Sequence, residues 1–332
     1  MKLITVEEHF MSKTIYDAMQ PYISQNTELE KARFQFVDHF VHTSDITEVG
    51  ERRIAFMDTN GISAQIIGYG NYSPMTLRKE NGAVELCRLA NDELYQSISR
   101  YPGRFYGYAT LPMDDVDASV SELERCVKEL DFRGIMLNGP LNGQFFDNSR
   151  FFPVFKRASD LSVPVYIHPA EVSNVVTDHY YMGDWSLMTA NLFSGFAIGW
   201  HYDTAMHLMR FILSGIFDKL PGLKIIVGHW GELLPYYFDR MNAALNPKVT
   251  GLNRCIKDYF YDHVYTNPSG MYYRDDFDFC RKVFHPEHLM WAQDYPYGVN
   301  DAQVSTFLEE CGLSDQKKHL IAHENAEKLF RL

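Results

Sequence analysis

Short apolar runs alternate along the chain with longer stretches in which apolar residues recur every three or four positions. In residues 81–100, for example, Leu86, Ala90 and Leu94 would share one face of a helix. A short apolar run bounded by turn-forming residues is instead typical of a buried strand. Eight such runs occur, at residues 3–6, 64–67, 105–110, 134–137, 163–167, 223–228, 264–266 and 289–293.

A stretch with helical periodicity follows each of these runs. The predicted helices cover residues 11–20, 46–60, 81–100, 116–130, 151–160, 201–217, a segment from 231 onward and 275–283, and two more end the sequence. Eight strand–helix units are the pattern of an α/β protein with a (β/α)8 TIM-like barrel. No internal repeat, low-complexity tract or linker divides the sequence, so we expect residues 1–332 to form a single barrel domain.

Two long segments interrupt the alternation. Residues 21–44 contain Pro21 and show little periodicity, so we expect an irregular loop. A loop of this length in a compact barrel often closes over a site, and a packed surface excursion is an equally good interpretation. The second segment, residues 171–200, is rich in aromatic side chains, and we expect it to form a wall of the barrel mouth or a subunit contact.

Ligand-type residues follow several of the predicted strands directly. The first strand opens onto Glu7 and His9, which point to the same face because they are two positions apart, while Glu8 points to the opposite face. His168 and Asp294 follow the fifth and eighth strands. An isolated Glu-x-His pair is usually an ordinary strand end, but parallel barrel strands all end at one rim. We therefore predict that these four residues bind a divalent metal ion, Zn²⁺ or Mn²⁺.

His229 follows the sixth strand, and Glu232 lies three residues later. If this segment is helical, the Glu232 carboxylate is one turn away and can orient the His229 ring and raise its basicity. His229 could otherwise donate only to a backbone carbonyl. We predict that His229 and Glu232 form a catalytic acid–base pair. The remaining histidines, including His201, are expected to be structural or solvent-facing.

The charge balance excludes some partners. The formal net charge is −12 and there is no block of lysines and arginines, which argues against nucleic acid. The same field would repel an anionic substrate unless a metal ion or a local arginine reverses its sign. No apolar run approaches the ~20 residues that cross a bilayer, and five scattered cysteines without a C-x-x-C pair indicate reduced thiols. We expect a cytoplasmic protein with no membrane partner.

Several motifs carry a resemblance to a known family. The sequence contains Glu7-Glu8-His9-Phe10, Asn138-Gly139, Ile167-His168-Pro169, Gly228-His229-Trp230-Gly231-Glu232 and Asp294-Tyr295-Pro296. In these motifs it resembles the amidohydrolase-superfamily decarboxylases typified by γ-resorcylate and 2,3-dihydroxybenzoate decarboxylases, across essentially the whole chain. The resemblance implies that Glu7, His9, His168 and Asp294 bind one divalent ion. It also implies that His229 and Glu232 lie beside that ion as an acid–base pair.

The resemblance extends to substrate binding. Relatives carry an arginine on the helix after the G-H-x-G-E motif, and Arg240 holds that place. In them this arginine approaches the substrate carboxylate, sometimes from a neighbouring subunit, so a homodimer or homotetramer is implied. Two-metal relatives often have a lysine at the end of strand four, where this chain has Asn138, which implies a mononuclear site. Asn138 is a second candidate for substrate binding.

These residues lead to a prediction of function. We expect metal-dependent, nonoxidative decarboxylation of an ortho-hydroxybenzoate-type aromatic acid, of the γ-resorcylate or 2,3-dihydroxybenzoate class, to the phenol and CO₂. Asp294 and His229 are the candidate proton donors, with Asp294 favoured. One alternative is a metal-dependent hydrolase of a lactone or amide, with His229 as base. Another is a metal-binding barrel used for assembly, which would leave the Glu232 partner of His229 unexplained.

Overall fold

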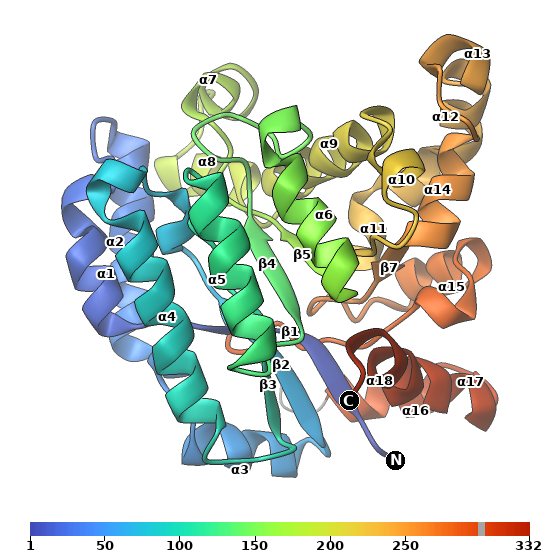
Figure 1. Ribbon diagram of the computed structural model, residues 1–332, viewed down its shortest axis with the longest axis horizontal. Coiled ribbons are helices and arrows are strands. Elements are labelled where there is room, and N and C mark those ends of the chain that lie inside the picture. The colour runs from blue at the N-terminus through green and yellow to red at the C-terminus, as the bar shows by residue number, and fades with distance from the viewer. Residues whose placement is uncertain (298–302) are drawn as a thin grey trace.

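A curled parallel sheet forms the centre of the molecule (Figure 1). The computed structural model describes residues 1–297 and 303–332. Its seven strands are paired in sequence order, each parallel to the next. They are β1 (Ile4–Phe10), β2 (Ala64–Tyr69), β3 (Phe105–Ala109), β4 (Gly134–Asn138), β5 (Val165–His168), β6 (Ile225–Val227) and β7 (Val264–Thr266).

The eighth predicted strand closes the ring without forming a regular ladder. Residues 289–295 lie between β7 and β1, where Met290 N donates to Thr266 O at 2.9 Å and Val6 N donates to Trp291 O at 2.9 Å. Isolated parallel bridges join this segment to both neighbours. The predicted α/β barrel is therefore confirmed, with a short and irregular closing segment in place of a full eighth strand.

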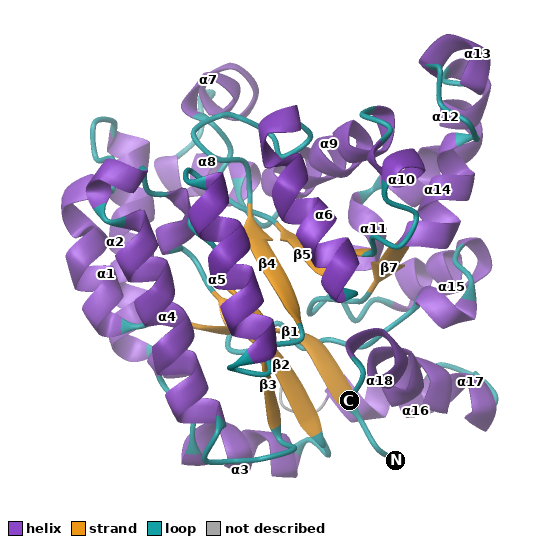
Figure 2. Cartoon of the chain, viewed as in Figure 1, coloured by secondary structure: helices purple, strands orange, loops and turns teal. Residues whose placement is uncertain are grey.

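Helices surround the sheet on its outer side (Figure 2). Those near the predicted positions are α1 (Lys13–Met19), α3 (Glu51–Thr59), α4 (Ala83–Ile98), α5 (Val116–Lys128), α6 (Phe152–Leu161), α9 (Gly199–Leu213), α10 (Ile216–Lys219), α15 (Arg274–Val283), α16 (Gln303–Glu310), α17 (Asp315–His319) and α18 (Asn325–Phe330). The segment after β6 holds α11 (His229–Glu232), α12 (Phe238–Ala244), α13 (Pro247–Thr250) and α14 (Ile256–His263). Among the described helices, none is long and apolar enough to cross a membrane.

Two apolar layers hold the strands in place. An inner cluster takes side chains from β1 to β6 and from the closing segment: Ile4, Val6, Ala64, Ile66, Tyr108, Met136, Tyr166, Ile226, Met290 and Ala292. The alternate strand residues belong to an outer cluster shared with the helices. Burial of both faces explains why these strands read as continuous apolar runs. Phe330 and Ala326 of α18 pack into the inner cluster, which is therefore a filled core and not a pore.

A β-bulge turns the candidate ligands of β1 toward the interior. The pairing of β1 with β2 shifts between Thr5 and Glu8, so that one extra residue lies on β1. Ile4 and Val6 point inward before the shift, and strict alternation would turn Glu7 outward. Phe10 belongs to the outer cluster, so the extra residue restores the inward direction for Glu7 and His9.

The prediction of an irregular loop over residues 21–44 is wrong, because most of it forms α2 (Glu28–Thr43). Thr27 and Glu30 form a capping box at its start, a signal that was present in the sequence. The buried side chains of α2 recur every fourth residue and are Leu29, Arg33, Val37 and Val41. Because an arginine occupies one of these positions, the apolar stripe is interrupted and the helical period is hard to recognise.

The segment 171–200 contains α7 (Asn174–Val176), a π-helical turn over Thr177–Tyr181 and α8 (Leu187–Ser194). α8 packs against α2, and Arg33 of α2 binds two residues of the segment 171–200. Its Nη2 donates to Ser194 Oγ at 2.7 Å, and its Nε lies 3.0 Å from Glu171 Oε2. Several large apolar side chains here are exposed, among them Tyr180, Trp185, Met188 and Phe196. A subunit contact at this segment stays a prediction.

Candidate active site

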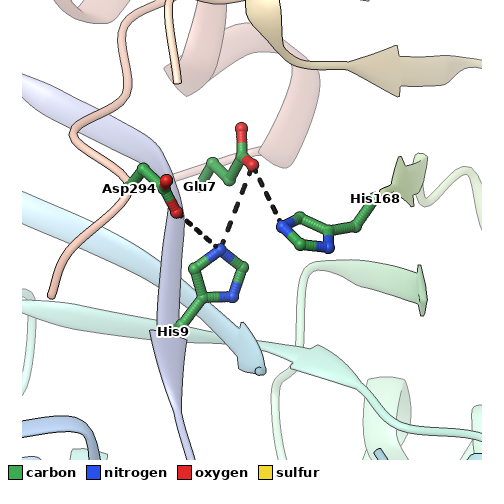
Figure 3. Close-up of side chains that lie close together, drawn as sticks. All are labelled: Glu7, His9, His168 and Asp294. Carbon is green, nitrogen blue, oxygen red and sulfur yellow. Dashed lines mark ion pairs between the residues drawn. The ribbon is translucent and has the colours of Figure 1, made fainter. Parts of the chain in front are cut away.

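Four predicted ligands meet at one point of the barrel mouth (Figure 3). β1 supplies Glu7 and His9, β5 ends in His168, and the closing segment supplies Asp294. His9 Nε2 lies 3.1 Å from Asp294 Oδ1 and 4.0 Å from Glu7 Oε1, and His168 Nε2 lies 3.4 Å from Glu7 Oε1. We call these four residues the metal cluster, because one ligand atom of each lies within 4.8 Å of the others.

The metal cluster has the geometry that a shared cation requires. Ligands about 2.1 Å from one ion lie about 3.0–3.4 Å apart, which matches the shorter separations observed. Glu7 Oε1, His9 Nε2 and Asp294 Oδ1 are buried and have no hydrogen-bond partner among the described residues. Buried polar atoms are rarely left without a partner. Two imidazoles and two carboxylates form a donor set that fits Zn²⁺ or Mn²⁺.

Burial disfavours charge on every member of the metal cluster. It raises the pKa of Glu7 well above its usual value, with the Asp294 charge adding to the effect. It also raises the pKa of Asp294 to about 7, against the opposing charges of His229 and His201. The pKa of His9 falls to about 3 and that of His168 falls well below its usual value, again mainly through burial. A divalent cation at this point would stabilise the carboxylates in their charged form.

Buried hydrogen bonds fix the Glu7 carboxylate on the side away from His168. The Tyr166 hydroxyl donates to Glu7 Oε2, and Asn267 Nδ2 donates to the same hydroxyl at 3.0 Å. These bonds fix one oxygen of Glu7 and leave Oε1 facing His168. Asn138 ends β4 beside His168 and donates through Nδ2 to Tyr69 O at 3.2 Å. Its predicted role in substrate binding stays a prediction.

A second group of titratable side chains, the glutamate cluster, consists of His201, His229 and Glu232. His229 Nδ1 lies 2.7 Å from Glu232 Oε1, and His201 Nδ1 lies 2.9 Å from Glu232 Oε2. Both contacts have hydrogen-bond geometry, so each imidazole donates to its own carboxylate oxygen. Burial would raise the pKa of Glu232, but the charges and hydrogen bonds of the two histidines lower it below its usual value. Glu232 is therefore a buried and ionised acceptor.

The backbone that joins His229 to Glu232 is not the predicted right-handed helix. All residues from His229 to Leu233 have positive φ angles between 49° and 90°. Only Gly231 adopts this conformation without steric cost, and there φ is 90°. The two side chains meet across a left-handed turn. A short 3-10 helix follows over Leu234–Tyr237, and the next α-helix, α12, begins at Phe238. The contact was predicted, but the reason given for it was wrong.

Sequence reasoning missed the role of His201. This residue lies near the start of α9. The centroids of the His201 and His229 rings are 4.2 Å apart. Its Nε2 lies 2.9 Å from the carbonyl oxygen of Phe196. No motif joins His201 to Glu232 in the sequence, because the two residues are 31 positions apart. His201 is thus buried and not solvent-facing, and a structural role for it stays a prediction.

The two clusters lie next to each other. Gly228, the residue before His229, approaches Glu7 so closely that a Cβ atom at this position would lie 2.7 Å from Glu7 Oε2. Only glycine leaves room for this approach. Glycine is therefore needed directly before His229, because it lets the backbone approach Glu7 and so brings the imidazole of His229 next to the metal cluster.

An aromatic wall stands on the other side of His9. Tyr297 packs against the His9 ring with a centroid distance of 5.3 Å, and Phe40 of α2 stacks on Tyr297 at 4.8 Å. Of the two interpretations of residues 21–44, this contact favours a segment that covers the site. Ring-lined walls are suited to aromatic ligands.

Arg240 lies outside both clusters. It is exposed on α12 and forms no hydrogen bond or ion pair with another described residue. Its predicted contact with the substrate stays a prediction, and within one chain the described structure supplies no partner for it.

Comparison with known proteins identifies the family. The family model for amidohydrolase matches residues 39–332. The chain is 28% identical to decarboxylase orsB of Emericella nidulans over 99% of this chain and 97% of that protein. It is 32% identical to the γ-resorcylate decarboxylase of Polaromonas sp. over 87% of this chain and 89% of that one. The chain belongs to the amidohydrolase family.

Solved structures agree with this assignment. The 5-carboxyvanillate decarboxylase of Novosphingobium aromaticivorans, complexed with manganese and 4-hydroxy-3-methoxy-5-nitrobenzoic acid, has a TM-score of 0.86 and 30% identity over 99% of this chain and 96% of that chain. The dihydroxybenzoic acid decarboxylase of Polaromonas sp., with bound manganese and 2-nitroresorcinol, has a TM-score of 0.86 and 27% identity over 100% of this chain and 97% of that chain. Within its family, this protein is a decarboxylase, a carboxy-lyase of the amidohydrolase superfamily. This finding selects the predicted decarboxylase over the hydrolase and the assembly protein.

Proposed function

We propose that this protein catalyses the nonoxidative decarboxylation of an ortho-hydroxybenzoate-type aromatic acid, of the γ-resorcylate or 2,3-dihydroxybenzoate class, to the corresponding phenol and CO₂. The observation that carries this proposal is the position of the glutamate cluster directly beside the metal cluster. The two manganese-bound relatives, with aromatic ligands, support the same assignment.

The chemistry explains why a site of this kind is needed. Direct loss of CO₂ from a benzoate leaves an electron pair in the plane of the ring, where the ring cannot delocalise it. With an ortho hydroxyl, loss of the phenolic proton lets an electron pair of that oxygen move toward the ring, so that the carbon that bears the carboxylate is protonated and the oxygen becomes a ketone. The bond to CO₂ then breaks and its electron pair restores the aromatic ring. The protein must therefore orient the acid, deliver one proton and accept another.

Glu7, His9, His168 and Asp294 would hold the divalent ion, Zn²⁺ or Mn²⁺. When bound, this ion supplies Lewis acidity and a template for the substrate oxygens. Asp294 is our candidate for the proton donor. The bound ion would keep its carboxylate ionised, so Asp294 must first take the proton of the phenol and then pass it to the ring carbon.

His229 is assigned to the hydroxyl group of the substrate. Its Nδ1 donates to Glu232, so its Nε2 is the atom that remains to bind the substrate oxygen and to return a proton to it after CO₂ has left. Glu232 stays ionised and fixes the orientation of the ring. The wall of Tyr297 and Phe40 would exclude water from the aromatic ring of the substrate.

Arg240 and Asn138 are proposed to bind the substrate. Because Arg240 is exposed on α12 and has no partner in its own chain among the described residues, we place it against the site of a neighbouring subunit in a homodimer or homotetramer. Mixing Arg240→Ala protein with His229→Asn protein under exchange of subunits tests this placement. Some hybrid sites then contain both intact residues, so activity should return. No recovery in proven hybrids would contradict the placement.

The reaction is tested with a panel of hydroxybenzoates and measurement of CO₂. In D₂O, the phenol should carry deuterium at the carbon that bore the carboxylate, and a matched benzoate without the ortho hydroxyl should not turn over. High bicarbonate should drive the phenol back to the acid, since a catalyst accelerates both directions. Hydrolysis of lactones with no CO₂ from any hydroxybenzoate would reject the proposal.

A further inference from the structure

Glu8 lies between two candidate ligands but faces away from them. It is fully buried, with no side-chain exposure. Its Oε1 accepts a hydrogen bond from Gln293 N at 3.0 Å, and its Oε2 accepts one from Tyr295 N at 2.8 Å. The two N–H groups held by this carboxylate belong to the residues on either side of Asp294. Burial raises the pKa of Glu8 to about 8, and the two backbone N–H donors act against this rise.

The backbone at Asp294 needs such support. Its φ angle is 62°, in the left-handed region that side chains other than glycine rarely adopt. The Asp294 N–H donates to Glu7 O at 3.0 Å, and His9 N donates to Tyr295 O at 2.8 Å. With the two bonds to Glu8, three successive N–H groups of the closing segment are bound to β1.

Arg53 of α3 supports the same junction from outside. It is fully buried, its Nη2 donates to His9 O at 2.5 Å, and its guanidinium lies 4.5 Å from the centre of the Tyr295 ring. It also contributes a positive charge near Glu8. β1 and the closing segment are thus joined around the Glu8 carboxylate, with the metal cluster on one side and α3 on the other.

We propose that Glu8 is a positioning residue that acts through Asp294. By binding the N–H groups of residues 293 and 295, its carboxylate fixes the left-handed backbone between them and thereby directs Asp294 Oδ1 toward His9. The inference rests on the proposed function only in requiring that the metal cluster binds a divalent ion. It does not depend on which aromatic acid is the substrate.

The test is a double-mutant cycle that measures Mn²⁺ affinity by calorimetry on the metal-free protein. Glu8→Gln keeps the size of the side chain but presents an NH₂ group to one of the two N–H donors, so one hydrogen bond is lost and two donors oppose each other. We expect Mn²⁺ binding to weaken about 10–100-fold, the range for loss of a group that orients a ligand. In an Asp294→Ala background, Glu8→Gln should cause no further loss, because the residue through which it acts is absent.

Glu122→Gln is the matched control. Glu122 is also a buried glutamate, but it accepts hydrogen bonds from Asn91 and Arg125 and contacts neither cluster. Its substitution should leave Mn²⁺ affinity unchanged. If Glu8→Gln does not accumulate as folded protein, Glu8→Asp, which keeps the carboxyl group on a shorter side chain, is measured in the same cycle.

Two results would overturn the inference. One is parental Mn²⁺ affinity in the folded Glu8 variant. The other is an equal loss of affinity in the presence and absence of the Asp294 side chain, which would mean that Glu8 acts on the fold and not through Asp294. A parent protein that binds no divalent ion would reject the metal site itself and this inference with it, whereas a failure to decarboxylate any hydroxybenzoate would leave Glu8 unaffected.

Discussion

The metal cluster and the glutamate cluster contain the same kinds of side chain, yet their nitrogen–oxygen distances differ. In the glutamate cluster the two distances are 2.7 and 2.9 Å, and both contacts have hydrogen-bond geometry. In the metal cluster they range from 3.1 to 4.0 Å, and three of the buried atoms have no hydrogen-bond partner among the residues described. A proton joins two atoms directly, whereas a metal ion needs space between its ligands.

The comparison also separates the carboxylates of the two clusters by their pKa shifts. Two histidine donors lower the pKa of Glu232, which keeps its negative charge although it is buried. Burial raises the pKa of Glu7 and of Asp294, which receive no such pair of donors. Composition alone does not distinguish a metal site from an acid–base site. The distances and the unpaired atoms do.

The largest expected effect is loss of the metal. His168→Ala and Asp294→Ala should each weaken metal binding so far that the purified protein loses its ion and its decarboxylase activity, because each removes one of the four candidate ligands. The three ligands that remain should still bind Mn²⁺ at high concentration, where calorimetry can measure the residual affinity. Glu232→Gln is the control from the other cluster and should keep one ion per chain. Elemental analysis of the purified proteins measures the occupancy. Full occupancy in both His168→Ala and Asp294→Ala would show that the metal cluster has been assigned wrongly.

His229→Asn should distinguish most clearly between the metal-binding role of one cluster and the acid–base role of the other. The asparagine amide can replace Nδ1 as the donor to Glu232, but nothing replaces Nε2. The variant should therefore keep its metal and its stability and lose on the order of 10²-fold or more in kcat. Steady-state kinetics and metal analysis on the same sample provide the measurement. An unchanged rate would remove His229 from the mechanism.

Arg240 should affect binding more than chemistry. Arg240→Ala should raise KM about 10–100-fold, which is the range for loss of a charged hydrogen bond, with the fold and metal content intact. Arg240→Lys keeps the charge but loses the planar fork, so it should recover only part of the affinity. Arg100→Ala, another exposed arginine, serves as the control. Parental KM in Arg240→Ala would contradict the assignment.

The smallest effect is expected at His201. His201→Leu leaves Glu232 Oε2 without its donor and should lower the free energy of unfolding by about 1–3 kcal/mol, while His201→Asn, which offers an amide N–H in place of Nδ1, should recover most of it. Chemical denaturation measures both. Equal stability of the leucine and asparagine variants would mean that the hydrogen bond contributes nothing.

The His201 effect should also depend on pH. Burial alone would lower the pKa of His201, but the charge and hydrogen bond of Glu232 outweigh it and raise that pKa. A raised folded-state pKa contributes stability that is complete below the unfolded value of about 6.5 and is lost as the pH rises through the folded value. The stability difference between the parent and His201→Leu should therefore shrink at higher pH. A difference that grows with pH would contradict this sign.

The strand ends could be predicted from sequence because the barrel imposes a strong rule. Strands that are buried on both faces appear in the sequence as apolar runs. The polar residues that directly follow these strands all lie at one rim of the barrel. This rule brings Glu7, His9, His168 and Asp294 together although they span almost the whole chain. The eight apolar runs were found at their correct places for the same reason.

What could not be predicted depends on local backbone geometry and on contacts between distant segments. The bulge in β1 follows from pairing with β2 and leaves no mark in the alternation of Leu3 to His9. The left-handed turn at His229 depends on packing around Gly228 and Gly231. His201 reaches Glu232 because α9 packs against α11, and no spacing rule in the sequence describes that approach.

The order in which the metal cluster is assembled has a consequence for synthesis of the protein. Glu7 and His9 are synthesised before the whole of the segment that contains β2 to β7, and Asp294 follows that segment. The nascent chain therefore has two of its candidate ligands long before it has all four. We expect the metal ion to enter after translation of the barrel, through the mouth of a folded chain, and not to act as a template around which the first strand forms.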